Sequence, residues 1–323
     1  MTIIRCAGLS LIGLSMLYSA SQAPTERRFA INYTVAVDRI PTLANRVDIW
    51  LSVPHDDAYQ SISHFDVTSD FSYREGFMTT SGKSKVQTGE YGNRMFHMRL
   101  DAPAIKPSIG FEMQFVVKRR EHLGLSSSGK ESKDPNPKRW LEPDRLAPLD
   151  DKIRGRAQEV VDAAGAKTDL DKARAIYNHI VATVKYDKTG EGWGRGDFHV
   201  IFIGYARALG IPARFSIGLS IPKGRGQGAI ASYHCWAEFY ISGMGWIPVD
   251  ASEAAKDPSK REYFFGTHDE NRVEFSRGRD LNLTPKQQGE PLNYFVYPYV
   301  EVDGKPYAGV KYTFRYADIA SKH

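Results

Sequence analysis

Four runs near the start of the chain alternate hydrophobic residues with polar or small ones, and this period of two constrains the fold more than any other feature. Side chains of a β-strand point alternately to its two faces, so the period predicts strands with one buried face. Turn-rich stretches between the runs are typical of a β-sandwich. We expect a sandwich domain at residues 24–123, with strands near residues 29–37, 47–53, 96–100 and 111–117.

Residues 124–149 interrupt this alternation. They have no hydrophobic periodicity and contain Pro135 and Pro137, so we predict a linker there. A chain of 323 residues exceeds what one hydrophobic core usually holds. We therefore expect a second domain over residues 150–323.

Three amphipathic helices are predicted to open this second domain. Each has a residue that can accept hydrogen bonds from the first free N–H groups of the helix. The predicted capping residues are Asp150 or Asp151 for the first helix, Thr168 with Asp171 for the second, and Asp197 for the third. The third has a broad apolar stripe before Gly210 and Pro212, which indicates a central, buried helix.

Strand patterns return after this helix, at residues 214–221, 231–241 and 246–249. Asp303-Gly304 predicts a hairpin between residues 300–302 and the alternating run 310–316. We expect the last strands to form a C-terminal β extension of the second domain.

Residues 1–23 resemble a secretory signal peptide. One positive charge precedes a short apolar stretch, and Ser21-Gln22-Ala23 fits the small-x-small pattern of a cleavage site. No later apolar run approaches the length of a membrane span. The sequence predicts a periplasmic or secreted protein without stable membrane insertion after cleavage.

The charge of the chain is only mildly basic. Removal of residues 1–23 takes away one basic residue, so 42 basic and 38 acidic residues remain and the formal charge is +4. The basic residues are scattered among acidic ones, which makes nucleic acid a poor candidate partner. An anionic polymer of the cell envelope remains compatible with this charge.

Cysteine is confined to two positions. Cys6 lies in the predicted signal peptide, which leaves Cys235 as the one thiol of the mature chain. An intrachain disulfide is therefore excluded. Such a cysteine must be buried, paired with another chain, or used chemically.

Motifs in the second domain resemble the transglutaminase-like superfamily, whose members are related to papain. They are the third helix followed by Gly-Ile-Pro-Ala-Arg at residues 210–214, Tyr-His-Cys-Trp-Ala-Glu at residues 233–238, and Gly-Trp-Ile-Pro-Val-Asp at residues 245–250. The resemblance extends from about Trp140 to Phe295. It implies an α+β fold with a papain-like core, here preceded by the all-β sandwich, and a Cys-His-Asp triad without a metal or an organic cofactor.

The resemblance assigns two members of this triad. His234 takes the position of the histidine that shuttles the proton, and Asp250 takes that of the carboxylate that orients it. The sequence also fixes a geometric condition. Asp250 lies on the His234 face only if the turn before it has an odd number of residues, such as Ser242-Gly243-Met244.

The nucleophile does not match. In the superfamily the cysteine lies two residues before the Asp-Phe-His that opens the third helix, and here that residue is Arg195. Residues 192–196 resemble a segment that relatives carry well upstream of their cysteine. We therefore expect that an internal deletion has removed the catalytic thiol.

Cys235 could in principle substitute for it. Because neighbouring residues of a strand face opposite ways, Cys235 should point away from the His234 side, and we interpret it as a small buried hydrophobe. We expect His199 to pack in the core or beside the site. Trp193 and Trp236 could bind substrate, although an aromatic core role is equally compatible with the sequence.

The resemblance implies acyl transfer or hydrolysis at peptide or side-chain amides. Its substrate would be a peptide, a protein or a cell-wall peptide. Without the nucleophilic thiol we expect this chemistry to be impaired. The alternative is a scaffold without catalysis that binds a peptide or the cell wall.

Overall fold

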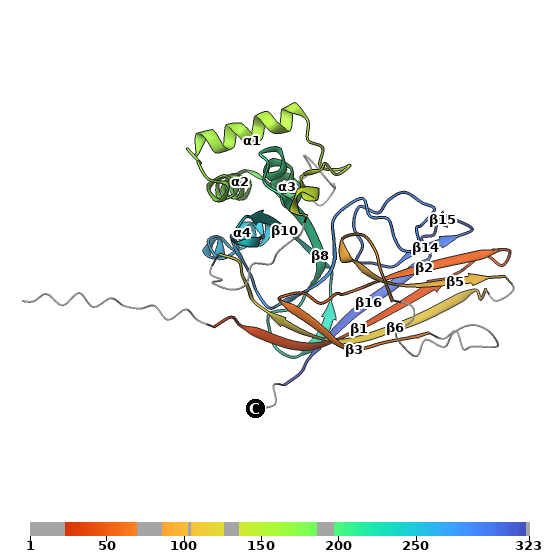
Figure 1. Ribbon diagram of the computed structural model, residues 1–323. Helices are drawn as coiled ribbons and strands as arrows, with labels where there is room; N and C mark the ends of the chain where they lie inside the picture. Colours follow the sequence, from red (N-terminus) through yellow and green to blue (C-terminus); the bar gives the residue numbers. More distant parts are fainter. Residues whose placement is uncertain (1–22, 70–85, 103–104, 126–135, 186–196, 321–323) are drawn as a thin grey trace, which may run out of the picture.

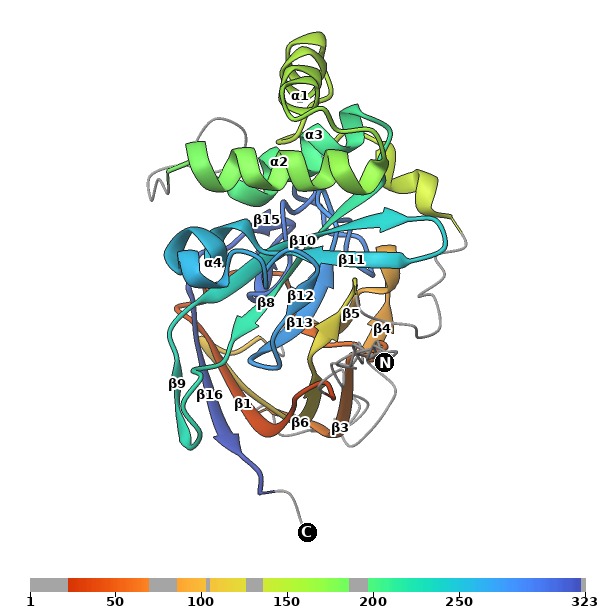
Figure 2. The ribbon, with the colours of Figure 1, turned by 90° about the vertical axis from the view of Figure 1, so that its left-hand side faces the viewer.

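The computed structural model describes residues 23–69, 86–102, 105–125, 136–185 and 197–320. The described part is built in three layers: helices, a four-stranded sheet, and a β-sandwich (Figures 1 and 2). Each strand pairing within it is antiparallel, and strands and helices occupy separate blocks of the chain. The predicted α+β class is confirmed.

The first sandwich sheet contains five strands whose inner side chains are buried. In spatial order these are β3 (Gln60–Ser69), β6 (Ser108–Arg120), β1 (Glu26–Asp38), β16 (Val310–Asp318) and β9 (Gln227–Ile230). Along β1 every second residue from Phe29 to Val37 is buried, as the sequence period predicts.

The second sandwich sheet also has five strands. They are β15 (Lys305–Pro306), β14 (Tyr299–Val302), β2 (Arg46–Val53), β5 (Arg94–Asp101) and β4 (Val86–Thr88). The inner faces of the two sheets share one hydrophobic core, in which Phe96 packs edge-on against Phe111 at 6.0 Å. A short helix, η1 (Glu90–Gly92), precedes β5.

The Asp303-Gly304 turn was predicted correctly, but its second strand was not. The turn joins β14 to the two-residue β15, with Glu301 opposite Pro306. The run 310–316 lies in β16, which crosses to the other sheet and pairs with β1. Pro306 has no N–H to continue the ladder, which agrees with the end of pairing there.

The C-terminal strands complete the sandwich. β16 lies between β1 and β9, and β14 pairs with β2. Both halves of the sequence thus contribute strands to each of the two sandwich sheets. The division into 24–123 and 150–323 stays a prediction, as does the linker at 124–149, in which Trp140 of η2 (Pro137–Leu141) is buried.

The four-stranded sheet forms the middle layer. Its order is β11 (Gly245–Val249), β10 (Tyr233–Ile241), β8 (Ala213–Ser220) and β13 (Arg272–Arg277). A two-stranded ladder of β7 (His122–Leu123) and β12 (Thr267–His268) lies beside it. The ring of Phe275 on β13 contacts Phe115 of β6 at 6.0 Å, so sheet and sandwich share packing.

The helices cover the other side of this sheet (Figure 2). They are α1 (Asp151–Ala163), α2 (Asp169–Thr183), α3 (Phe198–Ala208) and α4 (Ala251–Lys256), with the short η3 (Pro258–Lys260) after them. Asp150 caps α1, and Thr168 with Asp171 forms the expected capping box of α2. As predicted, α3 is central and largely buried.

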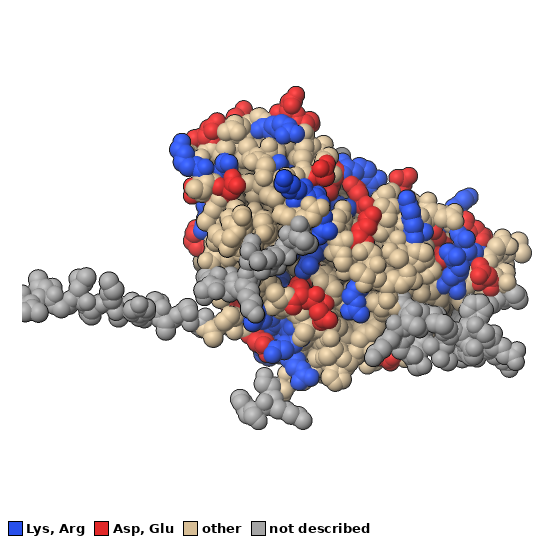
Figure 3. Space-filling model, in the orientation of Figure 1, with Lys and Arg blue, Asp and Glu red and all other residues tan. Residues whose placement is uncertain are grey.

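Two surface observations bear on partners. Figure 3 shows basic and acidic side chains interspersed over the face that it presents. In the described ranges, no helix is both long and apolar enough to cross a membrane. The predicted signal peptide lies outside the described residues, apart from Ala23.

Candidate active site

The first turn of α3 is held by Asp197, as predicted from the sequence. Its Oδ1 accepts hydrogen bonds from the backbone N–H groups of His199 at 3.2 Å and Val200 at 3.1 Å. Its Oδ2 accepts from Arg279, whose guanidinium also binds Asn293. The cap fixes the start of the helix and with it the position of His199.

The hairpin of β10 and β11 brings His234 to Asp250. Ile241 pairs with Gly245 and Ala237 with Val249, so the turn contains three residues, 242–244, and Gly243 has the positive φ of 83° that such a turn favours. One further residue in this register places Asp250 opposite Trp236. The predicted three-residue turn is confirmed, and His234 Nε2 lies 2.6 Å from Asp250 Oδ2.

Asp250 is completely buried and all its acceptor sites are used. Its Oδ2 also accepts from Arg272 at 3.1 Å, while Oδ1 accepts from the Ser252 hydroxyl and the Glu253 N–H, each at 3.0 Å. Burial alone would raise the pKa of Asp250, but His234, His199 and Arg272 hold it well below its usual range. Asp250 therefore remains a carboxylate and can orient an imidazole.

His234 has one ring nitrogen committed and one available. Nε2 is bonded to Asp250, whereas Nδ1 has no hydrogen-bond partner among the described residues. The side chain is 12% exposed. An oriented imidazole with a free nitrogen next to solvent can accept and return a proton, which is the role of an acid/base group.

A second histidine reaches the same carboxylate. His199 Nε2 lies 3.5 Å from Asp250 Oδ1, and its Nδ1 lies 3.5 Å from Cys235 Sγ. Burial favours the neutral ring, but Cys235 and Asp250 outweigh it and raise the pKa of His199 to about 10. The sequence predicted a buried His199 but not this contact, because strand alternation indicates only that Cys235 points away from the His234 side. Cys235 packs against the core as expected of a small hydrophobe, but it is only partly buried.

Of the two tryptophans predicted to bind substrate, the structure describes Trp236 but not Trp193. Trp236 is fully buried. The Arg272 guanidinium lies over its ring, and the ring of His268 packs edge-on with its centroid 5.5 Å away. Trp236 therefore packs against Arg272, which binds Asp250. Trp193 lies outside the described residues, as does Arg195, which the resemblance to the superfamily aligns with the nucleophile. Their roles stay predictions.

Sequence reasoning missed the role of Arg272. This residue belongs to β13, 22 positions after Asp250, and its guanidinium joins Asp250 to Asp269. The strand β13 was not among those predicted from the sequence, so no pattern marked this charged residue as buried. Such a residue must find a partner when it is buried, and only the fold shows which one.

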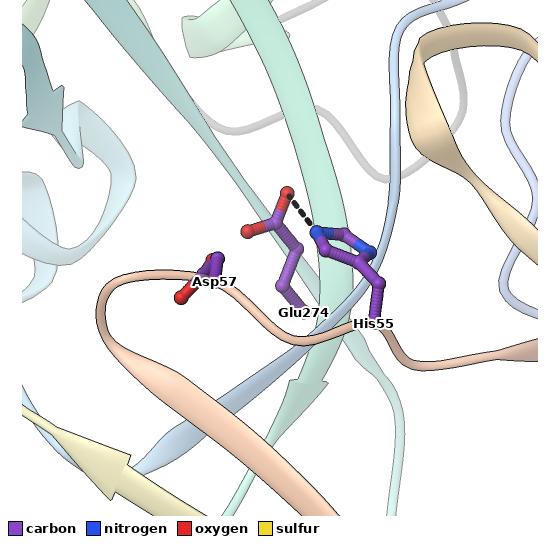
Figure 4. A group of neighbouring side chains, drawn as sticks. All are labelled: His55, Asp57 and Glu274. Carbon is purple, nitrogen blue, oxygen red and sulfur yellow. Dashed lines mark ion pairs between the residues drawn. The ribbon is translucent and has the colours of Figure 1, made fainter. Parts of the chain in front are cut away.

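A separate cluster lies where β13 meets the sandwich. His55, Asp57 and Glu274 place ligand atoms within 4.8 Å of one another. Figure 4 shows these three side chains. The guanidinium of Arg277 already binds Asp57 at 2.8 Å and both oxygens of Glu274. Arg277 thus supplies the positive charge that a metal ion would otherwise bring, and the cluster is an ion-pair network.

Comparisons with known proteins show what the region that contains His234 and Asp250 is similar to. Residues 154–251 match the model of the transglutaminase-like superfamily. The chain is 28% identical over 313 residues to an "Uncharacterized protein" of Haemophilus influenzae, with 81% of this chain and 82% of that protein covered.

Two crystal structures are also similar. The first is named "Putative Cysteine Protease" and comes from Cytophaga hutchinsonii, with a TM-score of 0.55, 16% identity and 93% of each chain covered. The second is the periplasmic domain of TgpA from Pseudomonas aeruginosa, with a TM-score of 0.34, 15% identity and coverage of 75% of this chain and 94% of that one. Residues 154–251 thus match the transglutaminase-like superfamily and include the paired His234 and Asp250, while the likeness to the first crystal structure is one of fold.

Proposed function

We propose that this chain is an exported transglutaminase-like protein that binds a peptide or side-chain amide beside His234 and in which acyl transfer is impaired. One observation carries the proposal. The His234 and Asp250 pair is assembled at 2.6 Å, yet the only thiol outside residues 1–23 is Cys235, which contacts His199 instead of His234.

The chemistry follows from what the pair can do alone. His234 can take a proton from a thiol and return it to a leaving amine, while Asp250 keeps the ring in its tautomer. Without a thiol it can only polarise water. Loss of the nucleophile from such a triad lowers turnover by about three to six orders of magnitude.

The expected substrate is a peptide, a protein side-chain amide or a cell-wall peptide. This class follows from the amide chemistry of the superfamily and from the predicted export to the periplasm or the medium. The mild positive charge is compatible with an anionic envelope polymer nearby. The Asp250 network binds no cofactor in this scheme, because its acceptor sites are already satisfied by protein groups.

A gain-of-function experiment tests this proposal. Residues 24–323 would be compared with a variant in which a Gly-x-Cys loop is restored ahead of Asp197, and with a matched variant carrying serine for that cysteine. Ammonia release and amine incorporation on a glutamine-containing peptide are the measured quantities. We expect activity only in the cysteine-restored chain, and its loss when His234→Ala is added.

Two outcomes would contradict the proposal. Activity of the unmodified chain at the level of the restored one would show that acyl transfer is intact. A folded, cysteine-restored chain that neither turns over nor binds the peptide would show that His234 and Asp250 no longer serve amide chemistry. Peptide binding without turnover in every variant would instead favour the scaffold alternative.

A further inference from the structure

Cys235 does not stand alone on its side of β10. Its Sγ lies 3.5 Å from Nδ1 of His199, and the ring of His199 is nearly inaccessible to solvent. The other ring nitrogen, Nε2, has no hydrogen-bond partner in the described structure and lies 3.5 Å from the Asp250 carboxylate. A thiol, an imidazole and a carboxylate are therefore arranged in sequence.

This arrangement favours charge separation between the thiol and the ring. The Asp250 carboxylate beside Nε2 favours the imidazolium form of His199, and an ionised sulfur beside Nδ1 would favour it further. An adjacent imidazolium in turn favours the thiolate, the form of cysteine that attacks electrophiles. The Asp250 carboxylate is fixed by Arg272, Ser252 and the Glu253 N–H, so it stays in place behind His199.

Cys235 is also within reach of reagents. It is partly exposed, whereas Trp236 and Ala237, which follow it on β10, are buried. Reactive cysteines combine a nearby positive charge with partial exposure, and structural cysteines are buried among apolar groups. The surroundings of Cys235 fit the first description.

We propose that Cys235 and His199 form a thiolate–imidazolium pair and that Cys235 is a site of covalent modification by disulfides. The thiolate attacks one sulfur of a disulfide R–S–S–R. The Cys235–S–S–R bond forms while the original S–S bond breaks, so Cys235 is oxidised and the departing R–S⁻ is reduced. His199 can give its proton to this leaving group.

The inference is independent of amide chemistry at His234. Among the described residues the His234 side chain is hydrogen-bonded to Asp250 and that of Cys235 to His199; the two histidines share Asp250, and their ring centroids are 6.5 Å apart. A protein that fails to bind any peptide could still carry this reactive thiol. Conversely, an inert Cys235 would leave the proposed function unchanged.

The first test needs no variant. Residues 24–323 would be incubated at pH 6 with bis(2-hydroxyethyl) disulfide, a small neutral probe, and adduct formation followed by intact mass. The same chain in concentrated urea supplies the rate of its unactivated thiol. We expect the native protein to react about tenfold faster or more. A native rate equal to or below the unfolded rate would overturn the proposal.

The second test assigns the effect to His199. His199→Gln removes the ring while it keeps a polar side chain of similar length, and His179→Gln on α2 is the matched control away from Cys235. With native secondary structure verified for both, we expect His199→Gln to bring the native rate close to the unfolded one and His179→Gln to leave it unchanged. A folded His199→Gln variant that reacts as fast as the wild type would contradict the assignment.

Discussion

Two buried polar clusters lie in contact with the four-stranded sheet, and they are built on different principles. Around Asp250, one carboxylate is shared by an arginine and two histidines. Around Arg277, one guanidinium is shared by Asp57 and Glu274, and burial together with the charge of Arg277 lowers the pKa of the adjacent His55 to about 3. The first cluster favours the protonated ring of His199, and the second keeps its histidine neutral.

The two clusters show how a site that can carry protons is distinguished from a structural ion-pair network in this molecule. Both clusters contain histidine and carboxylate, and both are buried. What distinguishes them is what carries the positive charge: Arg272 together with the titratable ring of His199 near Asp250, and the permanently charged Arg277 near Glu274. The following predictions probe this contrast through the free energy of unfolding.

The largest effect is expected for Arg277→Met. The substitution leaves Asp57 and Glu274 without their shared counter-charge, so we expect a loss of about 3–5 kcal/mol in the free energy of unfolding. Urea denaturation at pH 7 measures it. Arg156→Met, which removes an exposed ion pair with Glu159 on α1, is the control and should change stability by less than about 1 kcal/mol. Equal effects would refute the structural role of the cluster.

A smaller loss is expected for Asp250→Asn. The amide keeps the shape of the side chain but removes the charge that His234, His199 and Arg272 surround, and Arg272 retains Asp269. We expect about 2–3 kcal/mol at pH 7. Because the pKa of Asp250 is lowered on folding, its contribution is present above the ordinary carboxylate range and is lost as the pH falls below it. The difference between variant and wild type should therefore shrink on acidification.

The two clusters should respond to pH in opposite directions. The pKa of His199 is raised to about 10, so its contribution to stability is complete below about pH 6.5 and fades as the pH rises toward 10. The pKa of His55 is lowered to about 3, so the folded state loses stability as the pH falls from about 6.5 toward 3.

Unfolding of His199→Gln and His55→Gln beside the wild type, at pH 5 and pH 9, checks both signs. The stability lost in His199→Gln should be smaller at pH 9 than at pH 5. For His55→Gln, the free energy of unfolding relative to that of the wild type should be higher at pH 5 than at pH 9. If the stability difference from the wild type changed with pH in the same direction for both variants, the proposed contrast between the two clusters would be contradicted.

The smallest effect is expected for His55→Leu. Neither ring nitrogen of His55 has a hydrogen-bond partner in the described part of the chain, so an apolar side chain gives up no hydrogen bond there. We expect a change within about 1 kcal/mol at pH 7, in either direction. Thermal unfolding is sufficient to measure it. A loss of several kcal/mol would show that His55 is bonded in a way that the structure does not display.

Local features of the fold could be predicted from the sequence. The caps at Asp150, Thr168 and Asp197 follow from side-chain chemistry within three residues of each helix start. The three-residue turn before Asp250 follows from strand alternation, since an even turn would have placed Asp250 on the wrong face.

Features that join distant parts of the chain could not be predicted in this way. The pairing of β16 with β1 and β14 with β2 depends on how the chain crosses between layers, and alternation alone does not select the partner of a strand. For the same reason the contact between Cys235 and His199 was missed: the strand pattern gives the direction of Cys235 but not the residue that meets it. Arg272 is a third example, because only the folded structure shows that it binds Asp250.

The central claim is that the histidine and aspartate of the site persist while acyl transfer is impaired. The most direct measurement is the initial rate of ammonia release from a glutamine-containing peptide by unmodified residues 24–323, with His234→Ala and Cys235→Ala beside it. We predict a rate indistinguishable from buffer for all three proteins, each verified to be folded. A rate in the unmodified chain that either substitution abolishes would contradict the claim, and loss with Cys235→Ala would identify Cys235 as the nucleophile.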